Sequence, residues 1–167
     1  MKTKAKKVTM ETFVEIYDYH TKMFINALDG ISDKDAQNRL GTKANHIAWI
    51  AGSLVYQRQF LANAVGIDVK QTSENLFENN RGIQDNVTYP SLEEYKDDWE
   101  KISPLFKDAL ANMSEEQLNG PDPFNMPGGN YTFFDTTIFC IDRESYCIGQ
   151  IGLFRRLLGY EAMKYPE

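Results

Sequence analysis

Four long stretches of this chain carry apolar residues at three- and four-residue intervals, and no segment alternates apolar and polar residues as a strand does. This spacing gathers the apolar side chains on one face of a helix, and that face has to be buried. The sequence therefore predicts an all-α fold, a single four-helix bundle, with helices at residues 9–28, 42–65, 91–113 and 133–158.

The connection between the second and third helices, residues 67–90, is long and polar. A connection of about 25 residues can cross a bundle, so we expect the third helix to run parallel to the second. Thr42 is the expected N-cap of the second helix, and Ser91 with Glu94 forms a capping-box pattern for the third. Pro104 falls inside the third helix and predicts a kink there.

The composition fits one globular domain of 167 residues with a net charge of −6. The negative charge argues against nucleic acid as a partner, and the lysine cluster at residues 2–7 is expected to be a solvated tail. No apolar run reaches the roughly 18 residues that a membrane span needs. With two cysteines and no leader pattern, we expect a cytoplasmic protein with free thiols.

Polar residues fall on the inward faces predicted for three of the helices. His46 lies in the apolar stripe of the second helix, with Trp49 beside it. A helical-wheel count places one stripe of the fourth helix toward the core: Phe139, Arg143, Tyr146, Cys147, Gln150, Phe154 and Leu157. His20 faces inward from the first helix. The periodicity thus predicts that these helices converge on a shared interior.

Two segments, NHIAW at residues 45–49 and RESYCIGQ at residues 143–150, resemble signature segments of the DinB/YfiT-like family of four-helix-bundle proteins. That family places one His on its second helix and a His-x3-His pair on its fourth. The resemblance implies a DinB-like bundle over nearly the whole chain. Characterised relatives include thiol-dependent S-transferases and a maleylpyruvate isomerase, which act through a three-His divalent metal site.

Residue by residue, His46 matches the first family ligand, Arg143 stands at the second and Cys147 at the third. Arginine has no acceptor atom and keeps its positive charge, so it cannot bind a metal ion. We therefore expect a degenerate metal site and no metal cofactor. The alternative is a retained divalent ion, such as zinc or nickel, held by His46, Cys147 and His20.

Arg143 needs a partner if it is buried, and this partner is either a carboxylate from another helix or a bound anion. The leading functional hypothesis is a small anionic ligand in the bundle cleft. The pocket residues expected from the sequence are His46, Trp49, Arg143, Tyr146, Cys147 and Gln150.

Two other classes of function stay open at this point. One is a metal-dependent thiol S-transferase or hydrolase. The other is a non-catalytic interaction module, a homodimer joined through the fourth helix, which has a second stripe of apolar and small residues: Phe134, Ile138, Ile141, Ser145, Ile148 and Gly152. The sequence identifies neither a substrate nor a catalytic residue.

Overall fold

The computed structural model describes residues 10–166; the lysine cluster at residues 2–7 and the predicted helix start at Thr9 lie outside them. Four long helices make up the fold: α1 (Met10–Leu28), α3 (Ile47–Ala64), α4 (Leu92–Ala111) and α6 (Phe133–Leu157). The connections contain the short helices α2 (Asp33–Ala36) and α5 (Glu115–Leu118) and the 3₁₀ turns η1 (Glu74–Leu76) and η2 (Glu78–Asn80). The predicted all-α bundle is confirmed.

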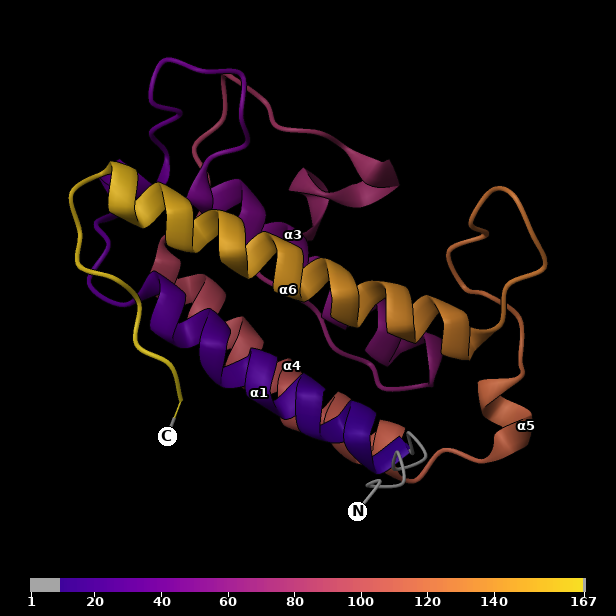
Figure 1. The fold of residues 1–167 in the computed structure, drawn as a ribbon. Coiled ribbons are helices and arrows are strands. Elements are labelled where there is room, and N and C mark those ends of the chain that lie inside the picture. Colours follow the sequence, from indigo (N-terminus) through magenta and orange to yellow (C-terminus); the bar gives the residue numbers. More distant parts are fainter. Residues whose placement is uncertain (1–9, 167) are drawn as a thin grey trace.

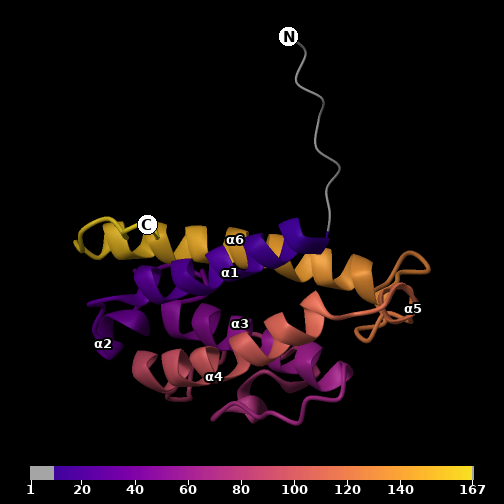
Figure 2. The same ribbon diagram turned by 90° about the horizontal axis from the view of Figure 1, so that it is seen from below.

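The four long helices form a closed ring, in which α1 and α3 each pack against both α4 and α6 (Figures 1 and 2). Two contacts show that α3 and α4 run parallel: the ring of His46 meets that of Tyr89, and three turns later Arg58 bonds to Ser103. The long crossover between these helices therefore carries the chain back along the bundle, as its length predicted.

The other pair of parallel helices is α1 and α6. Phe13 near the start of α1 meets Phe134 near the start of α6, and Arg155 near the end of α6 donates to the carbonyl oxygen of Ala27 near the end of α1. The chain order is thus up, down, down, up. The helices of each parallel pair are joined through long stretches of sequence rather than through tight turns.

The ends of the helices follow most of the predicted signals, with one correction. Ser91 and Glu94 form the predicted capping box at α4, which then continues unbroken through Pro104. Thr42, however, does not cap α3, because its hydroxyl donates to the carbonyl oxygen of Arg39 in a turn. The cap of α3 is His46, so this helix begins five residues later than predicted.

The buried side of α6 also differs from the predicted stripe. Phe139, Tyr146 and Leu157 are 53%, 68% and 61% exposed, so the prediction that they face the core is wrong. The buried residues instead are Phe133, Thr136, Thr137, Cys140, Ile141, Glu144, Cys147, Ile148, Ile151, Phe154 and Arg155. The predicted core face differs from the observed one by about one residue position. The prediction followed the apolar residues, but α6 carries large apolar residues on its outer side and polar residues on its inner side.

A buried ion pair connects α3 with α6 near the middle of the bundle. The Arg58 guanidinium donates from Nε to Oε1 of Glu144 at 2.7 Å and from Nη2 to Oε2 at 2.8 Å. Both side chains are buried, and Arg58 is completely so. This two-point contact is the geometry in which an arginine and a carboxylate bind each other most strongly.

The other two long helices complete the surroundings of Arg58. Nη1 donates to the hydroxyls of Thr21 on α1 and Ser103 on α4, at 2.7 and 2.6 Å. The guanidinium carbon lies 3.8 Å from the ring centroid of Tyr17 and 3.5 Å from that of Trp99, which adds cation–π attraction. All four long helices therefore contribute to one polar cluster inside an otherwise apolar core.

Burial alone would raise the pKa of the Glu144 carboxyl, but the charge and hydrogen bonds of Arg58 hold this pKa below its usual range. The Glu144→Gln variant would leave Arg58 buried without a counter-charge. We expect it to lose about 3–5 kcal/mol of unfolding free energy, measured by urea denaturation.

Two further variants distinguish a lost ion pair from a general packing defect. Replacing both partners with apolar residues, Arg58→Met with Glu144→Leu, should recover most of the loss. The matched control is Asp142→Asn, an exposed carboxylate on the same helix, which should change stability by less than about 0.5 kcal/mol. A loss below about 1 kcal/mol in Glu144→Gln would contradict the central role of the pair.

Candidate functional site

His46 is buried at the first turn of α3, where it serves as the helix cap. Its Nδ1 accepts a hydrogen bond from the backbone N–H of Trp49 at 3.0 Å. A backbone amide can only donate, so Nδ1 carries the lone pair and the proton of the neutral ring is on Nε2. Nδ1 is the ring nitrogen whose lone pair could bind a metal ion without a change of tautomer. This lone pair already accepts the hydrogen bond from the backbone of α3.

The surroundings of His46 favour the neutral ring. Burial, aided by the nearby positive charge of Arg39, lowers the pKa of His46 to about 4. The edge-to-face contact with Tyr89, at 4.8 Å between ring centroids, packs the imidazole against the end of the crossover. At neutral pH this histidine is therefore an uncharged hydrogen-bonding group.

Arg143 is half-buried on α6 and reaches across to α3. Its Nη1 donates to Oε1 of Gln57 and its Nη2 to the hydroxyl of Ser53, both at 3.0 Å. Both partners are neutral, and within residues 10–166 no carboxylate forms an ion pair with Arg143. The counter-charge that a half-buried guanidinium favours is thus not supplied by the described part of the chain.

The remaining predicted pocket residues are not among those that line the hollow at His46. Cys147 is buried one turn from Arg143, and burial raises the pKa of its thiol more than the charge of Arg143 lowers it. Gln150 and Trp49 are partly buried, while Tyr146 points to solvent on the outer side of α6. The structure thus keeps Arg143 and Cys147 together and places Tyr146 elsewhere.

His20, the third ligand in the metal alternative, lies beside the central ion pair. Its Nδ1 is 3.4 Å from Oε2 of Glu144, although the geometry is not that of a hydrogen bond. Across residues 10–166, no three His, Cys, Asp or Glu side chains converge as ligands of one ion. The residues present therefore do not fit the three-ligand site that the resemblance implies.

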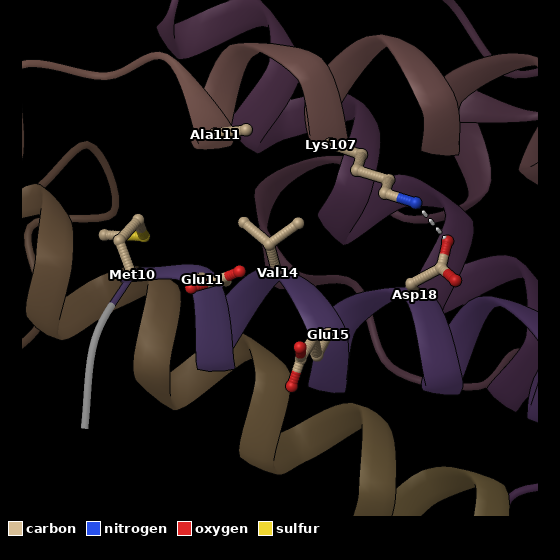
Figure 3. Close-up of a pocket in the computed structure, with 7 residues that line it drawn as sticks. All are labelled: Met10, Glu11, Val14, Glu15, Asp18, Lys107 and Ala111. Carbon is tan, nitrogen blue, oxygen red and sulfur yellow. Dashed lines mark hydrogen bonds and ion pairs between the residues drawn. The ribbon is translucent and has the colours of Figure 1, made fainter. Parts of the chain in front are cut away.

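Two hollows lie away from Arg143. The larger, about 390 Å³, is between the first turns of α1 and the last turns of α4, where Lys107 pairs with Asp18 at 2.6 Å (Figure 3). The smaller, about 170 Å³, contains His46 and is otherwise lined by Gln37, Arg39, Ile83, Gln84, Asp85 and Val87. Apart from His46, these lining residues were not predicted from the sequence, because residues 83–87 belong to the irregular crossover and carry no helical periodicity.

None of the helices within residues 10–166 is both long enough and apolar enough to cross a bilayer.

The state of His46 can be measured directly, because the chain contains only two histidines. By ¹H–¹⁵N NMR we expect the His46 ring to have its proton on Nε2 at pH 7 and to become charged only near pH 4. Because the unfolded ring binds its proton near pH 6.5, this residue should lower stability progressively as the pH falls from about 6.5 to 4.

The matched variant is His46→Asn, since asparagine caps helices but does not titrate. It should be nearly as stable as the wild type at pH 7 and lose less stability between pH 6.5 and 4. A His46 ring that titrates near pH 6.5 in the folded protein would contradict this assignment.

Several solved structures match this one in fold. A conserved protein from Enterococcus faecalis superimposes with a TM-score of 0.68 at 18% identity, covering 92% of this chain and 98% of the other. A DinB-like protein from Bacillus cereus superimposes with a TM-score of 0.67 at 16% identity, covering 94% and 95%. Neither a protein-family model nor a curated protein matches the sequence. The chain therefore has the DinB-like fold.

Proposed function

We propose that this DinB-like protein binds a small anionic molecule at Arg143 and does not use the three-ligand metal centre of its metal-dependent relatives. The observation that carries the proposal is the guanidinium itself. It reaches from α6 to α3, is half-buried, and among residues 10–166 has only the neutral side chains of Gln57 and Ser53 as hydrogen-bond partners. Carboxylates and phosphates bind arginine at two points, so either group would supply the missing negative charge.

The same contacts set the direction of the guanidinium. Gln57 is itself fixed, because its Nε2 donates to the carbonyl oxygen of Cys140 at 3.0 Å. Ser53 donates to the carbonyl oxygen of Ile50 at 2.9 Å. These bonds hold the acceptors of Arg143 in place, and further N–H groups of the guanidinium have no partner within the described part of the chain. An arginine held in this way loses less side-chain entropy when a ligand binds.

Three observations favour this function over metal-dependent catalysis. Arg143 stands where the family has a ligand and repels a divalent ion. Nδ1 of His46 is occupied by the helix cap, and the Cys147 thiol stays protonated because burial raises its pKa. A thiol must lose its proton before it can bind a metal ion.

The anion proposal is tested by thermal unfolding and calorimetry with acetate, succinate and inorganic phosphate. A ligand at 100 times its Kd should stabilise the fold by about 2.7 kcal/mol. Arg143→Gln should reduce this response, and Arg143→Lys should reduce it less, since lysine keeps the charge but loses the fork. Arg156→Gln, which removes an exposed arginine of the same helix, is the control. An equal response in wild type and Arg143→Gln would rule the site out.

Metal content is a separate test. Protein purified without a histidine tag should contain far less than one divalent ion per chain, measured by elemental analysis. Its melting temperature should not change with added zinc or nickel. One bound ion per chain that is lost in His46→Ala would instead support an S-transferase or hydrolase that uses His46, Cys147 and a third ligand.

A second candidate function, a homodimer joined through α6, is favoured by one observation. Four large apolar residues are exposed on the outer side of this helix: Phe139, Tyr146, Leu153 and Leu157. At 100° per residue they fall within about 40° of one another. The stripe expected from the sequence is not this one, because Ile141 and Ile148 of that stripe are buried in the core.

We expect sedimentation analysis to show a dimer that Leu153→Glu converts to a monomer without loss of helix content. The control is Ser145→Glu, which adds the same charge to another exposed position of α6. A wild type that stays monomeric at micromolar concentration would remove this candidate and leave the anion site untouched.

A further inference from the structure

A second polar site lies at the N-terminal end of α3, separate from Arg143. It is the hollow of about 170 Å³ that the end of the crossover, residues 83–87, forms with the loop before α3. Of its seven lining residues, five are polar: Gln37, Arg39, His46, Gln84 and Asp85. Most of the polar groups that line this hollow are hydrogen-bond donors.

The first donor is His46. Its Nδ1 accepts from Trp49, so Nε2 carries the proton, and this N–H has no partner within the described part of the chain. His46 is only 5% exposed, and it lines the hollow. The Nε2–H is therefore free to donate a hydrogen bond to an acceptor oxygen that enters the hollow.

The second donor is Gln84. Its side-chain Nε2 is shielded from solvent and has no hydrogen-bond partner among residues 10–166. The residue is held in place through its backbone, because its N–H donates to the Tyr89 hydroxyl at 3.0 Å. Gln37 is fixed in a similar way, since its Oε1 accepts from the N–H of Tyr89 and its amide nitrogen is left as a donor.

The third donor is Arg39, which already binds a carboxylate, that of Asp85. Nη1 contacts the Asp85 carboxylate at 2.6 Å, while Nε and Nη2 donate to the carbonyl oxygens of Ala44 and Lys43. The Asp85 side chain is 78% exposed and that of Arg39 is 26% exposed, so water screens this pair and it contributes little to stability. Of the residues that the structure describes, Asp85 is the only one that lines the hollow with a carboxylate.

We infer that this hollow is a binding site for a small carboxylate, which takes the place of Asp85 on Arg39 and accepts a hydrogen bond from His46 Nε2. A turn of the Gln84 side chain, whose Nε2 has no partner among residues 10–166, adds a second hydrogen bond to the ligand. One carboxylate replacing another leaves the charge beside Arg39 unchanged, whereas a phosphate dianion would add a negative charge. The N-terminus of α3, an 18-residue helix, also favours an anion at this end.

The size of the hollow limits the ligand. A water molecule takes up about 30 Å³, so 170 Å³ holds a ligand of only a few heavy atoms. Pockets for drug-sized molecules begin at about 300 Å³. Acetate and similar short carboxylates are therefore suitable probes.

The test is an NMR titration of the uniformly ¹⁵N-labelled full chain with acetate, with phosphate in parallel. Acetate should shift the Nε2 signals of His46 and leave those of His20 unchanged. His46→Asn keeps the helix cap but removes Nε2–H, and it should weaken acetate binding about tenfold, followed through the Gln84 side-chain amide. Gln84→Leu should weaken it similarly, followed through His46.

The Asp85→Asn variant makes the opposite prediction, because it removes the carboxylate that competes for Arg39. It should bind acetate several-fold more tightly than the wild type. Arg143→Gln should bind acetate at this site as the wild type does, which separates this site from the one proposed above. The inference is overturned if acetate leaves His46 unshifted, if Asp85→Asn binds no more tightly, or if phosphate binds more tightly than acetate.

Discussion

The bundle is organised around one guanidinium. Arg58 receives its counter-charge from α6, its neutral acceptors from α1 and α4, and an aromatic ring on each side, from Tyr17 and Trp99. A charge without water costs several kcal/mol unless every contact is in place. Each long helix therefore has a position along its axis at which it satisfies Arg58, and this fixes the register of the four helices more strictly than apolar packing alone would.

The fold could be predicted from the sequence because it depends on periodicity and length. Apolar spacing located the four helices, Ser91 and Glu94 marked the start of α4, and the length of the crossover gave the parallel arrangement of α3 and α4. The facing of α6 was predicted less well. Its core side carries Glu144 and two threonines, and its outer side carries exposed aromatic residues, so a count of apolar residues favours the wrong side.

The candidate site was harder to predict, because the roles of its residues depend on neighbours distant in sequence. The family resemblance implied that His46 is a metal ligand, but the structure uses its Nδ1 to cap α3, which a wheel diagram cannot show. The sequence indicated that Arg143 needs a partner, but not that the partners would be Gln57 and Ser53. Arg58 and Gln84 gave no signal, since their importance comes from partners on other segments.

The order in which the charges of the core are synthesised has a consequence for folding. Arg58 is made 86 residues before Glu144, and Glu144 lies on the last helix of the bundle. Until that helix has been made, α1, α3 and α4 can only enclose a guanidinium that has no counter-ion. A three-helix intermediate is thus penalised electrostatically as well as by its open apolar face, so compaction of this chain should be delayed until α6 is available.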